Sequence, residues 1–80
     1  MAKIEFYDSE GRYFYGNVKD NGNIEVYDPD NNYWYGKVKE GGGIDLYDHN
    51  SKYLSGKIKP DGKIDLYDSS GGYFYGRLKD

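Results

Sequence analysis

The sequence predicts an all-β protein in which four β-hairpin repeats form one antiparallel meander of eight strands. Three observations carry this prediction. The chain repeats itself every 20 residues without insertion or deletion, apolar and polar residues alternate within each repeat, and glycine, asparagine and proline separate the alternating segments. Alternation with a period of two, bounded by turn residues, is typical of strands joined by tight turns. The 80 residues suffice for one small domain.

The predicted domain covers residues 1–80 and divides into four repeats. The repeats span 4–23, 24–43, 44–63 and 64–80. Six positions are identical in all four repeats, and in the first repeat they are Ile4, Tyr7, Asp8, Tyr13, Gly16 and Lys19. A unit of this length cannot bury its own apolar face, so we expect the copies to pack together.

Each repeat is predicted to contain two strands, which in the last repeat are residues 63–68 and 73–79. One face of these strands is apolar, and in the first repeat it carries Ile4, Phe6, Phe14, Gly16 and Val18. The opposite face carries tyrosine and charged residues. A helix would distribute both kinds of residue around its axis, so the strand interpretation is favoured.

The turn within a repeat is predicted to be a type I turn that closes with a G1 bulge. Its sequence in the second repeat is 28–31, Asp-Pro-Asp-Asn, which places asparagine where a positive φ is required. The turn between repeats follows the same rule. A two-residue turn at Asn21-Gly22 would pair Val18 with Glu25, whereas a three-residue loop pairs Val18 with Ile24 and keeps the apolar face intact.

This alternation also predicts which residues lie opposite one another. Phe6 is expected to oppose Phe14, and Ile4 to oppose Gly16. On the polar face, Lys37 is expected opposite Asp45, and Lys57 opposite Asp65. Opposite charges across a sheet stabilise it by ~0.2–1 kcal/mol. In the recurring segment "IDLYD" the two aliphatic residues are therefore core, the first Asp pairs with a lysine, and the last Asp opens a turn.

A single sheet with one apolar face must close on itself or cover that face with another copy. The expected registers shift by two residues per repeat, which gives eight strands a shear of ~8 and a tilt of ~36°, as in a small barrel filled by side chains. When the same registers are extended from the last strand to the first, Leu78 pairs with Ile4 and Arg77 with Glu5. We therefore predict a closed, monomeric barrel. The alternative is an open single-layer sheet or one that dimerises face to face.

Composition excludes several classes of function. The chain has no cysteine, and its single histidine, His49, cannot form a multi-histidine metal site. A net charge of −3 with interspersed signs argues against a nucleic-acid partner and gives no reason to expect a membrane partner. The N-terminal residues show no apolar segment, so a soluble chain without signal peptide or transmembrane helix is expected. Its cellular location is left open.

The acidic residues are predicted to be structural. Residues 28–32 match the opening of a calcium loop, but they lack its glycine, and Lys39 stands where the closing glutamate belongs. Glycines 41–43 precede a strand rather than a helix, so they do not predict a phosphate loop. No catalytic, cofactor-binding or metal-binding residue is predicted, and the protein is expected not to be an enzyme.

The tyrosine face is the one predicted binding surface. Its candidate residues are Tyr15, Tyr27, Tyr35, Tyr47 and Tyr75. Aromatic side chains beside charged groups suit sugar rings, so glycans or cell-wall ligands are the expected partners. The first hypothesis is nevertheless a non-enzymatic repeat scaffold without evolved activity, in which tyrosine only covers an exposed sheet, and the binding module is its alternative.

Residues 35–44 carry a Tyr-x-Gly-x-x-x-x-Gly frame, Tyr-Asp follows at 47–48, and this pattern runs through all four repeats. In this the chain resembles hairpin repeats of the MORN kind, although their units are slightly longer and carry more glycine after the turn. That resemblance implies a scaffold or interaction role. The chain is also loosely similar to choline-binding cell-wall modules, but it has only Trp34 where they have tryptophan pairs. The unbroken period equally suggests a designed or consensus-built repeat protein.

Overall fold

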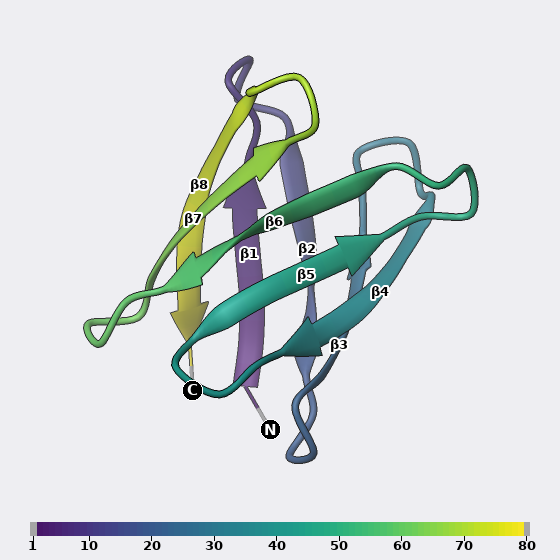
Figure 1. Cartoon of the computed structure of the whole chain (residues 1–80). Helices are drawn as coiled ribbons and strands as arrows, with labels where there is room; N and C mark the ends of the chain where they lie inside the picture. Colours follow the sequence, from purple (N-terminus) through teal and green to yellow (C-terminus); the bar gives the residue numbers. More distant parts are fainter. Residues whose placement is uncertain (1, 80) are drawn as a thin grey trace.

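The structure is a computed structural model that describes residues 2–79, so positions 1 and 80, the limits of the predicted domain, lie outside the described residues. The described residues form eight strands: β1 (Ala2–Tyr7), β2 (Tyr13–Val18), β3 (Asn23–Tyr27), β4 (Tyr33–Val38), β5 (Gly43–Tyr47), β6 (Tyr53–Ile58), β7 (Lys63–Asp68) and β8 (Tyr73–Lys79). Each strand is antiparallel to its neighbour, and β8 pairs with β1 to close a barrel (Figure 1). Within residues 2–79, no helix has the length and hydrophobicity to span a membrane.

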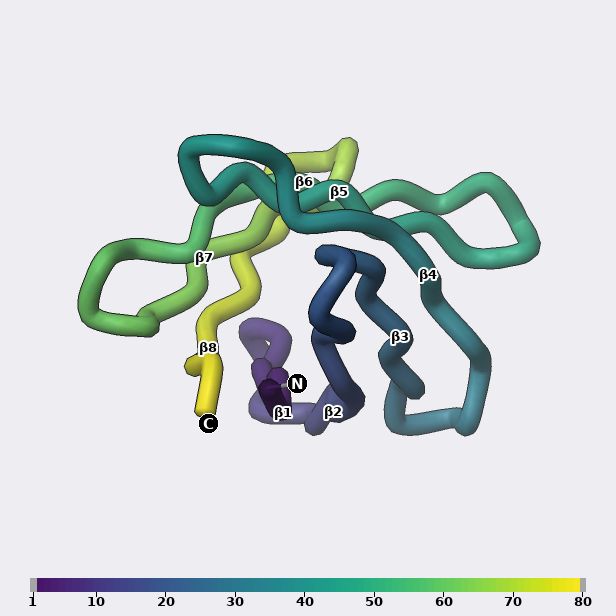
Figure 2. Tube along the Cα trace, turned by 90° about the horizontal axis from the view of Figure 1, so that it is seen from below, coloured from purple at the N-terminus to yellow at the C-terminus, as the bar shows by residue number. Residues whose placement is uncertain are grey.

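The strand registers confirm the predicted pairings. Phe6 lies opposite Phe14, and Ile4 opposite both Gly16 and Leu78. Extending the registers once around the barrel from Ile4 gives a net offset of eight residues along the chain. A shear of eight for eight strands corresponds to a tilt of ~36° and an interior that side chains fill. The closed path of the chain is visible in Figure 2. The open-sheet and face-to-face alternatives are therefore wrong.

The apolar face of the sheet forms the barrel interior. The buried residues are Ile4, Phe6, Phe14, Ile24, Val26, Trp34, Ile44, Leu46, Leu54, Ile64 and Leu66, with Val18, Val38, Ile58, Phe74 and Leu78 packed against them. Aromatic rings concentrate near the turns within repeats, where Phe14 stacks on Phe6 at 4.7 Å between centroids and meets Phe74 edge-on at 5.5 Å. These stacked and edge-to-face contacts fill that end of the barrel interior with aromatic side chains.

The turns have the predicted geometry. In the first repeat, Asp8 Oδ1 accepts hydrogen bonds from the backbone N–H groups of Glu10 and Arg12, both at 2.9 Å. Between repeats, the Gly22 N–H donates to the Lys19 carbonyl at 2.9 Å, and Gly22 has a φ of 88°. This is the three-residue loop, so the parity argument against a two-residue turn is confirmed.

A glycine in the middle of the second strand of each repeat allows two backbones to approach closely. A Cβ atom added to Gly36 would lie 1.8 Å from the Asp45 carbonyl oxygen on β5. Gly16, Gly56 and Gly76 face the next strand in the same way. From the sequence alone, a side chain at Gly36 is expected to overpack the core. The structure corrects this, because the obstruction is the backbone of the neighbouring strand, which cannot move like a side chain.

We therefore expect Gly36→Ala, which adds one methyl group, to cost more than the ~1–3 kcal/mol of ordinary overpacking. Chemical denaturation monitored by circular dichroism measures the loss. Gly43→Asn is the matched glycine substitution, because asparagine already occupies the equivalent position at Asn23. It should leave the unfolding free energy almost unchanged. Equal losses for the two variants would contradict the close-approach explanation.

The αL position of the turns within repeats offers a stabilising substitution. It is occupied by Gly11, Asn31, Ser51 and Gly71, all with positive φ. Ser51 has a φ of 65°, which costs a residue with a Cβ ~1–2 kcal/mol. Ser51→Gly should raise the melting temperature by roughly 4–8 °C per kcal/mol recovered. Ser69→Gly, at a position of the fourth turn without positive φ, should bring no gain. A lower melting temperature for Ser51→Gly would show that the turn is unstrained.

Candidate functional site: the tyrosine belt

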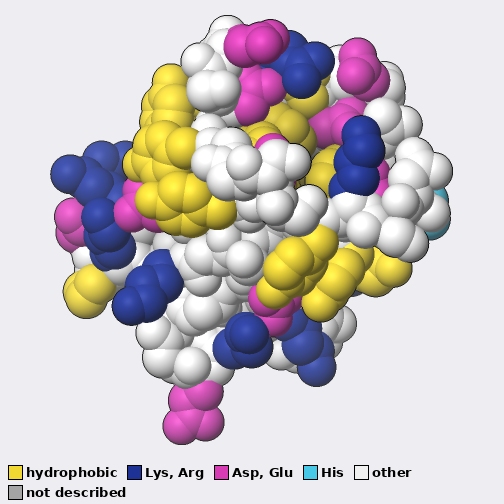
Figure 3. Space-filling view, turned by 45° about the horizontal axis from the view of Figure 1, so that its top comes forward, with side chains coloured by type: hydrophobic (Ala, Val, Ile, Leu, Met, Phe, Trp, Pro, Cys, Tyr) yellow, Lys and Arg dark blue, Asp and Glu magenta, His cyan; other side chains and the backbone are white. Residues whose placement is uncertain are grey.

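The outer surface of the barrel carries a band of tyrosine side chains, which we name the tyrosine belt. Its members are Tyr7, Tyr13, Tyr15, Tyr27, Tyr33, Tyr35, Tyr47, Tyr53, Tyr67, Tyr73 and Tyr75. Most of them are 40–49% exposed, which leaves ring surface open to solvent. In Figure 3, side chains of the hydrophobic class, tyrosine included, form groups on the surface that charged residues border.

Ring-to-ring contacts join the belt in spatial order. They run from Tyr67 through Tyr73, Tyr75, Tyr7, Tyr13, Tyr15, Tyr27, Tyr33, Tyr35 and Tyr47 to Tyr53, with centroid separations of 4.9–6.2 Å. Among the described residues, no ring contact joins Tyr53 to Tyr67. Ser55 stands between them, at the position that Tyr35 occupies one repeat earlier. The belt therefore has one gap.

The structure brings the predicted site residues together in pairs. Tyr15 lies opposite Tyr27 and Tyr35 opposite Tyr47, with centroids 6.0 and 6.2 Å apart. Tyr75 has a partner that was not predicted, Tyr7 across the seam, at 5.8 Å. The belt tyrosines missed by the sequence analysis are Tyr7, Tyr13, Tyr33, Tyr53, Tyr67 and Tyr73. The sequence could have indicated them, because the positions of Tyr7 and Tyr13 are occupied by tyrosine in every repeat.

The acidic residue beside the first isoleucine forms an ion pair with a lysine in every repeat, and in the first, third and fourth repeats it also accepts a hydrogen bond from a tyrosine hydroxyl. Asp45 forms an ion pair with Lys39 at 2.7 Å and accepts a hydrogen bond from the Tyr53 hydroxyl. Equivalent ion pairs join Lys19 to Glu25, Lys59 to Asp65 and Lys79 to Glu5.

These ion pairs correct the predicted partners. Lys37 lies directly opposite Asp45 in the register, as expected. The ion pair nevertheless goes to Lys39, two residues further along the chain and just past the end of β4. Strand twist makes such diagonal neighbours reachable by a long side chain. The lysine that forms the pair is the one present in all four repeats, whereas the directly opposite position varies between Asn17, Lys37, Lys57 and Arg77.

These contacts shift the proton affinities of the groups involved. Hydrogen bonds from Lys39 and Tyr53 hold the pKa of the Asp45 carboxyl below its ordinary value. The same contacts raise the pKa of the Lys39 ammonium group and of the Tyr53 phenol. All three groups are therefore held in the charge state they have at neutral pH, which suits a structural role more than proton transfer.

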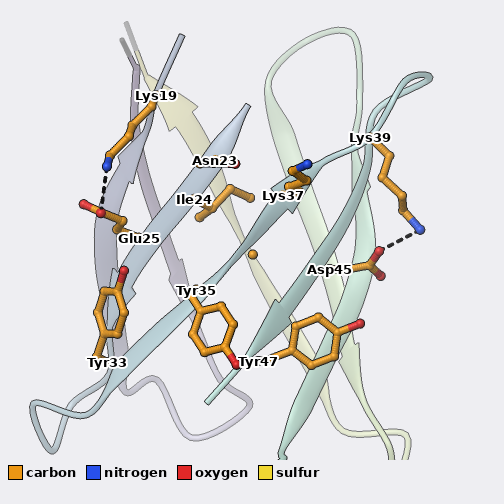
Figure 4. Close-up of a pocket in the computed structure, with 11 residues that line it drawn as sticks. Lys19, Asn23, Ile24, Glu25, Tyr33, Tyr35, Lys37, Lys39, Asp45 and Tyr47 are labelled. Atoms are coloured by element: carbon orange, nitrogen blue, oxygen red, sulfur yellow. Dashed lines mark ion pairs between the residues drawn. The ribbon is translucent and has the colours of Figure 1, made fainter. Parts of the chain in front are cut away.

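A groove of about 440 Å³, the Tyr35 groove, lies between neighbouring parts of the belt (Figure 4). The rings of Tyr33, Tyr35 and Tyr47 lie along one side, and Ile24 and Gly36 contribute to its lining. The Lys19–Glu25 and Lys39–Asp45 ion pairs flank it, and Lys37 lies between them. The groove thus combines aromatic ring surface with hydrogen-bond donors and acceptors, within the ~300–1,000 Å³ of small-molecule sites.

The same groove recurs at two other repeats. The Tyr15 groove has a volume of about 520 Å³, and the Tyr75 groove about 410 Å³. Each contains three tyrosines from equivalent positions, a strand glycine and two acidic residues of the ion pairs. The repetition arises from the repeated sequence, because equivalent positions of the barrel present equivalent side chains.

The turn acids lie outside these grooves. Asp28 Oδ1 accepts the backbone N–H groups of Asp30 and Asn32, and its Oδ2 accepts the Trp34 indole N–H at 3.1 Å. This is an Asx-type turn, in which the aspartate has the structural role that was predicted for it. Among residues 2–79, no group of three or more acidic or histidine side chains is arranged to hold a metal ion. His49 instead lies against Tyr35, at 6.4 Å between ring centroids.

Comparisons with protein families, curated proteins and solved structures find no match to this chain. The class of the molecule therefore rests on its own fold and surface. It is a closed antiparallel β-barrel of hairpin repeats with a tyrosine-rich exterior.

The ion pairs make stability depend on acid pH. The folded pKa of Asp45 lies below its unfolded value, so the folded state binds fewer protons in the acid range. The resulting stability is present above the unfolded pKa of about 3.9 and is lost as the pH falls through the folded pKa. Lys39→Met should reduce this loss in unfolding experiments across the acid range. Lys37→Met is the matched control and should leave it unchanged. The reverse ranking would support the directly opposite pair.

Proposed function

We propose that this protein is a non-enzymatic, monomeric hairpin-repeat barrel whose tyrosine belt binds carbohydrate. The observation that carries the proposal is the recurrence of one groove at equivalent places on the belt. A pyranose ring offers an apolar C–H face and a rim of hydroxyl groups. Exposed tyrosine rings next to carboxylate and ammonium groups match both features.

The groove retains polar capacity for a ligand although its charges are paired. A carboxylate has about four lone-pair sites, and an ammonium group has three N–H donors. In the Tyr35 groove, Glu25 and Lys19 use only part of this capacity in their contact at 2.9 Å. Sugar hydroxyls, which donate and accept, can use the remainder without breaking the ion pair.

A scaffold without a ligand of its own is the second candidate. The observation that favours it is the structural use of the repeated polar residues. In the third repeat, Asp48 caps a turn, and Asp45 joins Lys39 to Tyr53. The tyrosine belt would then serve only to cover the sheet and supply ring contacts across strands.

The origin of the repeats remains part of this proposal. Hairpins with equivalent registers and an unbroken 20-residue period support descent from, or design on, one consensus unit. The resemblance to MORN repeats remains a prediction, and it is compatible with an interaction role. Neither proposal includes a nucleic-acid or membrane partner.

The two candidates are separated by titration with tetrasaccharides of β-linked glucose, N-acetylglucosamine, mannose and xylose, each tested individually. Tyrosine ring resonances observed by NMR report the binding. We expect saturable shifts of Tyr15, Tyr35 and Tyr75 with a dissociation constant of about 1 mM or tighter, equivalent to about −4 kcal/mol. The absence of saturable shifts with every tetrasaccharide would leave the scaffold as the answer.

The variant that tests the assignment replaces Tyr15, Tyr35 and Tyr75 together by serine, the residue already present at Ser55. It should fold and lose binding. Tyr67→Ser is the matched control, because Tyr67 is an exposed belt residue that lines none of the three grooves. Its binding should equal that of the unaltered protein.

A further inference from the structure

The three grooves are consecutive copies around the barrel. Each is formed mainly by one repeat and the first strand of the next, together with a lysine of the preceding repeat, so the Tyr75 groove crosses the seam from β8 to β1. Neighbouring grooves share a carboxylate. Glu5 lines both the Tyr75 and Tyr15 grooves, and Glu25 lines both the Tyr15 and Tyr35 grooves. A ligand that fits one groove therefore meets the same tyrosine rings, strand glycine and carboxylates in the other two, whereas the residue next to the glycine is Asn17, Lys37 or Arg77.

The third repeat lacks the tyrosine that would complete a fourth groove. Ser55 lies opposite Tyr67 in the register, as Tyr35 lies opposite Tyr47. The position of Ser55 distinguishes the grooves from one another. Its equivalents Tyr15, Tyr35 and Tyr75 each line one groove and neither of the other two. A substitution at this position therefore changes one site at a time.

The grooves face different directions. Equivalent positions are two strands apart in a barrel of eight, so consecutive grooves are rotated by about 90° around its axis. The Cα trace measures only 25 × 21 × 18 Å. A straight oligosaccharide lying in one groove therefore leaves the surface before it reaches the next. Each groove is open to a separate chain.

Resting on the proposed carbohydrate-binding function, we infer that the barrel is trivalent and cross-links chains of a neutral pyranose polymer. The neutral class follows from what the three grooves share, because their carboxylates are all held in ion pairs with lysines. The cations outside a salt bridge in the described chain differ from groove to groove, with Lys37 in the Tyr35 groove, Lys3 in the Tyr15 groove, and Lys63 and Arg77 in the Tyr75 groove. A ligand that depended on one of these charges would not fit all three grooves. Three weak sites on one small body gain apparent affinity for a polymer, because binding at one site raises the local concentration for the others.

Calorimetric titration with each of the four tetrasaccharides tests the valency. We expect three equivalents per protein, two for Tyr35→Ser and four for Ser55→Tyr. Tyr67→Ser alone should still bind three equivalents. It should reduce four to three in the Ser55→Tyr background, where Tyr67 belongs to the new groove.

Light scattering with the corresponding long polymer tests cross-linking. The unaltered protein should raise the scattering most at an intermediate ratio of protein to polymer. The double variant Tyr15→Ser/Tyr35→Ser has one groove left. It should bind one equivalent of tetrasaccharide and should not raise the light scattering of the polymer. One equivalent for the unaltered protein would overturn trivalency and leave carbohydrate binding intact. No saturable binding in any titration would overturn the proposed function itself, and the trivalency with it.

Discussion

The close approach of neighbouring backbones at the strand glycines is the constraint on which the barrel depends. At Gly36 the carbonyl oxygen of Asp45 occupies the space that a Cβ atom would need. Four such positions, one in each repeat, let the sheet coil tightly enough for eight short strands to close. Closure then aligns the registers, encloses the apolar face and removes the unpaired sheet edges that would otherwise invite aggregation.

Much of the fold could be predicted because side-chain alternation in a strand is discrete. A register slip of one residue would expose the whole apolar face, so parity alone excluded the two-residue turn before Ile24. The same counting across repeats led to the contact between Leu78 and Ile4. Length, period and parity together left few arrangements, which explains why the closed barrel could be predicted from one short sequence.

The predictions failed for features that side-chain alternation does not encode, namely the reach of side chains, backbone dihedral angles and the arrangement of the surface. The partner of Asp45 is Lys39 rather than Lys37, because strand twist brings a diagonal side chain closer than the opposite one. Ser51 adopts a positive φ that its residue type does not suggest, in a turn where Asp48 Oδ1 accepts hydrogen bonds from the backbone N–H groups on either side of it. For the candidate site, the sequence indicated the tyrosine face, but only the three-dimensional arrangement shows the continuous ring contacts and their interruption at Ser55.

The seam between β1 and β8 is equivalent to the three covalently connected joints between repeats. Ile4 lies opposite Leu78 as Ile24 lies opposite Val18, and Lys79 pairs with Glu5 at 2.6 Å. Packing therefore does not specify where the chain begins. A circular permutant opened at Gly41-Gly42, with the original ends linked, would retain every strand pairing. Linear repeat arrays need specialised terminal units, whereas here each repeat caps its neighbour in a ring.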